Sequence, residues 1–217
     1  MKLSFSRSIW SYSKVQTLVG LALRNRRIQV ARLPDRSLLN LGCGNAIHPD
    51  FLNLDWHWRP GVNLCWDLSK RLPLVSDSMR GVYTEHCLEH LELPVVRFVV
   101  GEVFRVLQRG ATFRVVVPDF QLYFSLYAQF QSGLQPPVPY HPHPLPPSIT
   151  PFMAIEEVFF LHGHRTGFDF EKLELLLQEA GFSEIRRASF HQGRNPELLI
   201  DSPEREIESL YVEAVKP

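Results

Sequence analysis

The chain has 217 residues, 45% of them hydrophobic, and a formal net charge of zero. That length suits one α/β domain with a full core and is too short for two, and no apolar run reaches the roughly 18 residues that a membrane-spanning helix needs. The three cysteines are scattered and odd in number, which argues against a disulfide framework and favours a reducing, cytoplasmic setting.

Residues 1–36 are expected to form a basic helical arm ahead of a catalytic domain at 37–217. The arm holds eight Lys and Arg residues against one Asp. From about Ile9 to Arg27, apolar residues recur at steps of three and four, the pattern of an amphipathic helix. Such a helix either packs on the domain as a lid or contacts an anionic membrane through residues 1–32; vesicle binding that weakens with salt would indicate the second. No nucleic-acid partner is expected, because the basic charge is confined to the arm.

The stretch from Leu38 to Asp55 organises the rest of the chain. An apolar run predicts a buried parallel strand that stops at the turn Gly42-Cys43-Gly44, where the absence of Cβ atoms lets a cofactor approach the backbone. A second strand ends at Asp55, placed to accept hydrogen bonds from ribose hydroxyls. The dinucleotide fingerprint G-x-G-x-x-G is not met, since its third glycine would fall at Ile47. A nicotinamide enzyme is therefore disfavoured.

Further strands and helices alternate along the remaining sequence. Strands are predicted at 62–66, 81–84, 112–117 and 184–190, with an antiparallel one at 207–215, and helices at 93–107, 120–131 and 169–180. Gly110 is expected to end the first of these helices in a left-handed conformation. The segment 133–151 contains eight prolines and is predicted to be irregular, either a lid or acceptor-binding loop or a segment disordered without acceptor.

Several of these segments together resemble the class I S-adenosylmethionine (SAM)-dependent methyltransferases. They are LNLGCG with HPDFLNLD, LPLVSDSMRGVYTEHCLEHL, RVLQRGATFRVVVPDF and the AGF before the 184–190 strand. The similarity is greatest to small bacterial members found beside glycosyltransferases. It implies a doubly wound, mostly parallel seven-stranded sheet with helices on both faces and an antiparallel last strand, with the first helix reduced to a turn or two around His48-Pro49.

The resemblance also implies the cofactor, SAM, and its product S-adenosylhomocysteine. The residues expected to bind it are Asn40, Gly42, Cys43, Gly44, Asp55, Asp67, Leu68 and Glu85. The expected reaction transfers a methyl group to a hydroxyl of a glycan or another small hydroxylated acceptor. Because a hydroxyl is a poor nucleophile until its proton is taken, histidines near the crevice, namely His86, His90 and His164, are the candidate catalytic residues.

The sequence His86-Cys87-Leu88-Glu89-His90 permits other chemistry. It spells H-x-x-E-H, the pattern of inverted zinc proteases, so a metal-dependent hydrolase is a rival interpretation, and a non-catalytic SAM-binding partner subunit is another. At a helix start, His86, Glu89 and His90 would share one face. Small-RNA 2′-O-methyltransferases look similar here, with Glu-x-x-Glu-His supplying metal ligands. In this chain His86 replaces the first glutamate, and this loss of an oxygen ligand disfavours magnesium. A divalent metal completed by His164 stays an alternative but is not the expectation, because Leu-Glu-His-Leu is widespread in methyltransferases without metal.

Overall fold

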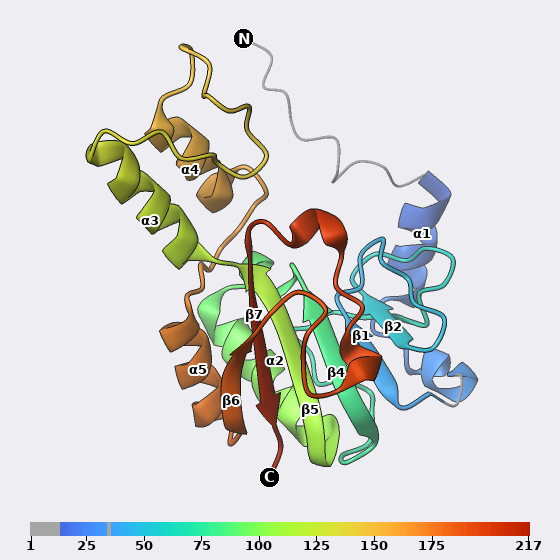
Figure 1. Ribbon diagram of the computed structural model, residues 1–217. Coiled ribbons are helices and arrows are strands. Elements are labelled where there is room, and N and C mark those ends of the chain that lie inside the picture. Colours follow the sequence, from blue (N-terminus) through green and yellow to red (C-terminus); the bar gives the residue numbers. More distant parts are fainter. Residues whose placement is uncertain (1–13, 34–35) are drawn as a thin grey trace.

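The computed structural model describes residues 14–33 and 36–217, which form an α/β fold built on one mixed β-sheet (Figure 1). The strands are β1 Leu38–Leu41, β2 Leu52–Asp55, β3 Leu64–Cys65, β4 Met79–Glu85, β5 Leu107–Pro118, β6 Ser183–Ala188 and β7 Ser209–Val215. Their order in the sheet is β3-β2-β1-β4-β5-β7-β6, with β3, β2, β1, β4 and β5 parallel and β7 antiparallel to both of its neighbours. The predicted sheet with an antiparallel last strand is confirmed.

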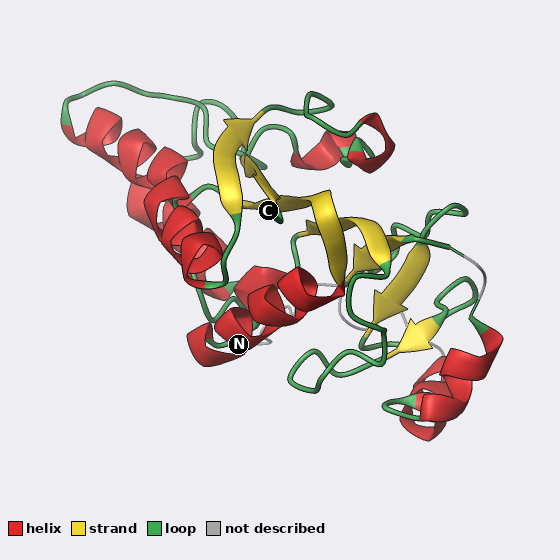
Figure 2. Ribbon diagram, turned by 90° about the horizontal axis from the view of Figure 1, so that it is seen from below, coloured by secondary structure: helices red, strands yellow, loops and turns green. Residues whose placement is uncertain are grey.

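The helices are α1 Lys14–Leu23, α2 Leu93–Val106, α3 Phe120–Gln131, α4 Pro151–Phe160 and α5 Phe170–Glu179, with short 3-10 helices η1 Arg27–Arg32, η2 Leu88–His90, η3 Pro196–Leu198 and η4 Pro203–Arg205. Valines at helical spacing bury one side of α2 against the sheet, and α5 packs into the same core. The opposite face of β4, β5 and β7 is covered by residues 188–200, with Leu198 of η3 fully buried. Figure 2 shows the longer helices along one side of the sheet. The helix after β1 is reduced to turns, as predicted.

The α2–β5 junction differs from the expectation in one detail. The helix ends at Val106 and β5 begins at once at Leu107, five residues before the predicted strand. Gly110 does take a left-handed conformation, with a φ of +76°, but it lies inside β5 and not at the helix end. Its N–H donates to the carbonyl of Lys216 at 2.7 Å. The left-handed glycine therefore lets β5 hydrogen-bond to the residue that follows β7.

The described part of the N-terminal arm packs on the β2–β3 side of the domain. The side chain of Gln29 donates to the carbonyl of Leu23 at 2.7 Å and accepts from the N–H of Cys65 at 2.9 Å. The Arg24 guanidinium lies 3.9 Å from the centre of the Trp56 ring and donates to the Trp56 carbonyl. These contacts are those expected of a helix packed against the domain.

The apolar residues of α1 are not all turned toward the domain, which the lid interpretation would require, and the membrane-contact interpretation stays a prediction. Val15 and Leu18 are each 66% exposed, whereas Gly20 is the buried residue of the helix. Residues 9–13, where the predicted helix begins, lie outside the described part of the chain. Among the described residues, no helix is both long and apolar enough to cross a bilayer.

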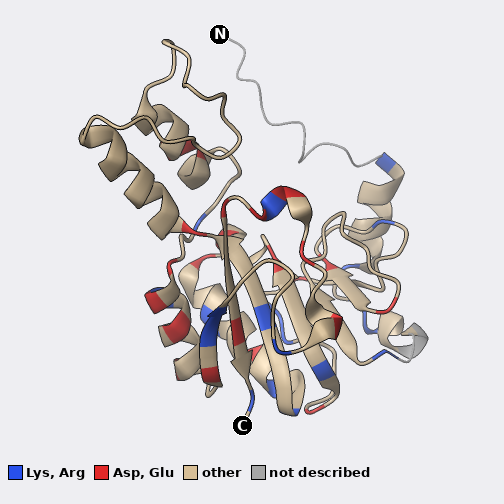
Figure 3. Ribbon diagram, viewed as in Figure 1, with Lys and Arg blue, Asp and Glu red and all other residues tan. Residues whose placement is uncertain are grey.

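The Pro-rich segment packs against a helical projection formed by α3 and α4. Residues 134–150 contain no helix or strand, as predicted, but Val138 is buried with Phe130 of α3 and Ala154 of α4. Helix α4 was not expected; Pro151 occupies its first turn, and the hydroxyl of Thr150 accepts from the N–H of Met153. In Figure 3 the α3–α4 projection carries few charged residues compared with α5.

Candidate active site

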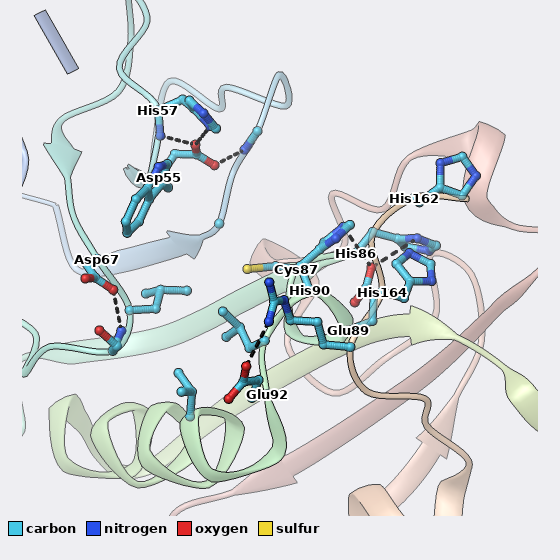
Figure 4. A pocket seen from close by; sticks show the side chains of 18 of the residues that line it. Asp55, His57, Asp67, His86, Cys87, Glu89, His90, Glu92, His162 and His164 are labelled. Carbon is cyan, nitrogen blue, oxygen red and sulfur yellow. Dashed lines mark hydrogen bonds and ion pairs between the residues drawn. The ribbon is translucent and has the colours of Figure 1, made fainter. Parts of the chain in front are cut away.

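A cavity of about 750 Å³ lies at the carboxyl ends of β1, β2 and β4, a size typical of small-molecule sites. Residues from distant parts of the chain line its two ends, and Figure 4 shows them on opposite sides of the view. One end is lined by Gly42, Gly44, Asp55, His57, Asp67 and Leu68. The other end is lined by His86, Glu89, His90, His162, His164, Arg205 and Glu208. The first set holds predicted cofactor residues and the second all three predicted catalytic histidines.

The glycine turn after β1 is fixed by close packing. Gly42 has a φ of +70°, and a Cβ added there would lie 2.2 Å from the sulfur of Cys87. Only glycine fits this position without displacing the chain after β4. The N–H groups of Gly42 and Cys43 both donate to the carbonyl of Leu54, which ties the turn to β2. The turn therefore presents its bare backbone at the cavity wall.

Asp55 is held at the tip of β2 by two backbone donors. Its Oδ2 accepts from the N–H of Gly44 at 2.8 Å and its Oδ1 from the N–H of His57 at 2.7 Å. The residue is only 9% exposed, so the carboxylate has one fixed orientation at the cavity. Each carboxylate oxygen has capacity for a further hydrogen bond, which two adjacent hydroxyls of a ribose would supply.

The other predicted cofactor residues divide into two groups. Asp67 and Leu68 line the cavity, and the N–H of Asp67 donates to the Asn25 side chain, so the arm helps to place this segment. By contrast Asn40, Cys43 and Glu85 are not among the cavity-lining residues. The Asn40 amide donates to the carbonyl of Ala46 and to the Asn53 side chain, and Glu85 accepts from the N–H of Ser202. In the structure the side chains of Asn40 and Glu85 therefore brace neighbouring loops.

At the opposite end, His86 is tightly enclosed. It is a non-glycine residue with a φ of +46°, and its Nε2 lies 2.8 Å from the hydroxyl of Ser209. Burial lowers the pKa of His86 to about 2, and the nearby Arg205 guanidinium adds to the shift. The imidazole is thus neutral at physiological pH and a weak base, which is unfavourable for its predicted role as the proton acceptor.

His90 and His164 face each other across the same end of the cavity. Their ring centroids are 4.9 Å apart at an interplanar angle of 70°. Burial is the main cause of the lowered pKa of each, and it brings the pKa of His164 to about 4. The loop bearing His164 is fixed next to η2 because the N–H groups of Arg165 and Thr166 both donate to the carbonyl of Glu89.

The predicted helix start around His86 is replaced by a loop and the three-residue η2. Cys87 is the N-cap and the 3-10 helix covers only Leu88–His90, so the three residues do not share a helix face. They still converge, since the Oε1 of Glu89 lies 3.6 Å from Nδ1 of His86 and 3.9 Å from Nε2 of His90. Burial raises the pKa of Glu89 to about 8.

Arg205 and Glu208 were not predicted as site residues. They come from the segment just before β7, where Glu208 accepts from the hydroxyls of Tyr123 at 2.6 Å and Tyr140 at 2.8 Å. A second cavity of about 260 Å³ adjoins the first and shares His162, Arg205 and Glu208 with it. The Pro-rich segment lines this second cavity through Pro139, Tyr140 and His141. No local sequence pattern identifies Arg205 and Glu208 as site residues, because only the return of the chain to β7 brings them to the cavity.

Comparison with solved structures identifies the fold. The chain matches a SAM-dependent methyltransferase from Archaeoglobus fulgidus with a TM-score of 0.51 at 16% sequence identity, over 93% of this chain and 94% of that one. It matches a SAM-dependent methyltransferase from Thermotoga maritima, described as a possible histamine N-methyltransferase, with a TM-score of 0.51 at 15% identity, over 92% and 88% of the two chains. No protein-family model and no curated protein sequence matches the chain. The structure therefore has the fold of class I SAM-dependent methyltransferases.

Proposed function

We propose that this protein is a SAM-dependent methyltransferase that methylates a hydroxyl of a glycan or another small hydroxylated acceptor. The observation that carries the proposal is the division of one cavity into two chemically different ends. A glycine turn and the fixed Asp55 carboxylate stand at one end, suited to the amino-acid and ribose parts of SAM. His86, His90 and His164, whose pKa values are lowered by burial, stand at the other end, where an acceptor would lie.

In the proposed reaction the acceptor oxygen attacks the methyl carbon in line with the sulfonium. The O–C bond forms as the C–S bond breaks, the bonding electrons stay on sulfur as the thioether of S-adenosylhomocysteine, and the hydroxyl proton leaves to a base or to water. Most of the catalysis is alignment, since the sulfonium is already a good electrophile. His90 and His164 are the better candidates for accepting the proton, because the His86 imidazole is enclosed and very weakly basic.

The two rival interpretations have less support. An inverted zinc protease needs its histidines on a helix, whereas His86 precedes a three-residue 3-10 helix in a sheet of methyltransferase topology. A non-catalytic SAM-binding subunit would need only the glycine turn and Asp55. The polar end of the cavity, with four histidines and Glu89, favours turnover over binding alone.

Titration calorimetry with SAM and S-adenosylhomocysteine tests the cofactor, and an acceptor screen with labelled methyl donor tests the reaction. We expect both ligands to bind at one site per chain, and label to appear in a hydroxylated acceptor. Binding without transfer to any hydroxylated compound would favour the partner-subunit interpretation. Absence of binding by either ligand would contradict the proposed function.

The second cavity supports a contribution of the Pro-rich segment to acceptor binding. His141 lines this cavity, and its Nε2 lies 3.4 Å from a carboxylate oxygen of Glu157 in α4. We expect His141→Ala to raise the KM for the acceptor several-fold while SAM affinity stays at the parent value. His143→Ala, an exposed change in the same segment, is the control and should alter neither quantity. Equal losses of SAM and acceptor binding in His141→Ala would instead indicate that the segment is a structural brace.

A further inference from the structure

The most unusual side chain in the cavity wall is Glu89. It is fully buried, and within the described part of the chain neither of its carboxylate oxygens has a hydrogen-bond partner. A buried carboxylate without partners is costly, so such groups in proteins are paired or coordinate a metal. Imidazole nitrogens of His86 and His90 lie 3.6 and 3.9 Å from its Oε1, too far for hydrogen bonds.

At least one histidine beside Glu89, His164, leaves an unprotonated ring nitrogen available. The Nδ1 of His164 lies 2.5 Å from the carbonyl of Val158, and because a carbonyl only accepts, this nitrogen carries the proton and Nε2 keeps its lone pair. A ring N–H bonded to a backbone carbonyl is the arrangement that orients histidine ligands in metal sites. The Nε2 of His90 also points to the Glu89 carboxylate, at 3.9 Å.

The spacing of these atoms fits a shared ion. One ligand atom from each of Glu89, His90 and His164 lies within 4.8 Å of the other two. Ligands bound at about 2.0–2.2 Å to one ion are themselves roughly 3–4 Å apart, so a small inward movement would bring all three to bonding distance. Figure 4 shows the three side chains gathered at the acceptor end of the cavity.

We propose that Glu89, His90 and His164 bind a divalent transition-metal ion, with zinc as the best match. Two imidazoles and one carboxylate form a nitrogen-rich set that suits zinc, manganese or iron, whereas magnesium prefers oxygen ligands and octahedral geometry. The nearby cation Arg205 is paired with Glu208 at 3.2 Å and makes no hydrogen bond to Glu89. Three protein ligands leave a coordination position open toward the cavity, where a hydroxyl could bind and lose its proton more readily. That catalytic use rests on the methyl-transfer proposal, and in it the ion takes over the activation of the hydroxyl from His90 and His164, whose free ring nitrogens are then its ligands. Metal binding itself does not depend on that proposal.

Direct metal binding tests the site without any activity assay. Protein stripped with a chelator is titrated with Zn²⁺, Mn²⁺ and Mg²⁺ by calorimetry, and its metal content is measured after desalting. We expect one tightly bound Zn²⁺ per chain and at least 100-fold weaker binding of Mg²⁺. Magnesium binding as tight as zinc, or zinc binding no tighter than in the variants below, would overturn the proposal.

Matched variants distinguish metal binding at this site from adventitious metal binding by surface histidines. Glu89→Gln and His164→Ala should each weaken Zn²⁺ binding at least 100-fold, and His143→Ala, which changes an exposed histidine, should not. Zn²⁺ should raise the melting temperature of the parent but not that of Glu89→Gln. The metal-free Glu89→Gln protein should melt no lower than the metal-free parent, because the unpartnered carboxylate is gone, so a loss of binding is not a loss of folding. SAM titrations on the same samples distinguish failure of the metal site from failure of the proposed function.

Discussion

Replacing Arg114 with methionine is expected to lower the free energy of unfolding by about 3–5 kcal/mol, as measured by urea denaturation. Arg114 is fully buried in β5, and its guanidinium donates to both oxygens of Asp201 at 2.8 and 2.6 Å. It also donates to Glu213 of β7 at 3.3 Å and to the backbone carbonyls of Ser189 and Gln192. Methionine would fill the space but leave the buried Asp201 without its cation and Glu213 with only the half-exposed Arg186 at 3.1 Å, and that is the source of the large loss.

An exposed arginine supplies the control for this prediction. Arg80 in β4 pairs with Glu197, and its side chain is 49% exposed, so Arg80→Met should cost no more than about 1 kcal/mol. Arg114→Lys should be intermediate, because a lysine keeps the charge but cannot donate to both Asp201 oxygens at once. A loss in Arg114→Met as small as that in Arg80→Met would mean that the carboxylates are relieved by protonation or water.

The change Asp55→Ala should weaken SAM binding by about 1.5–3 kcal/mol, or roughly 10- to 150-fold in Kd. Those values are typical of lost hydrogen bonds to a charged group. The carboxylate also holds the glycine turn through the N–H of Gly44, so its removal should loosen both the ribose contact and the turn. Titration calorimetry with SAM measures the effect.

Two further variants sharpen that test. Asp55→Asn keeps one oxygen to accept from Gly44 while losing the charge, so its affinity should fall between the parent and Asp55→Ala. Asp50→Ala changes an exposed carboxylate, 79% exposed, and should bind SAM like the parent. If Asp55→Ala binds SAM at the parent affinity, the ribose lies elsewhere in the cavity.

The end of the cavity formed by the glycine turn and Asp55 was the part most open to prediction from sequence. The apolar run of β1, the glycine turn and the acid at the end of β2 are local features whose physical cause lies within 18 residues of chain. Helix α5 was equally accessible, because Asp169 caps it through the N–H of Lys172 and Gly181, with a φ of +101°, follows it. For each of these elements, the residues that mark its beginning and its end are visible in the sequence itself.

The parts that were missed depend on contacts far apart in the sequence. Arg114 stands in an apolar strand with nothing nearby to indicate Asp201, 87 residues later, as its partner. Arg205 and Glu208 reach the cavity only because the chain returns to β7. Helix α4 is different, since a Thr-Pro start was visible at Thr150 and Pro151, but the eight prolines of 133–151 made continued irregular structure the simpler prediction.

The position of β7 has a consequence for how the chain folds. β7 is the last strand in sequence, yet it lies between β5 and β6, and within the described sheet β6 pairs with no other strand. A chain emerging from the ribosome therefore has β5 as an open edge, and β6 has no neighbour, until residues 209–215 are made. Pairings between strands so far apart in sequence form slowly, and unpaired edges favour aggregation in the meantime. Loss of only these seven residues should thus expose two strands at once and yield insoluble protein.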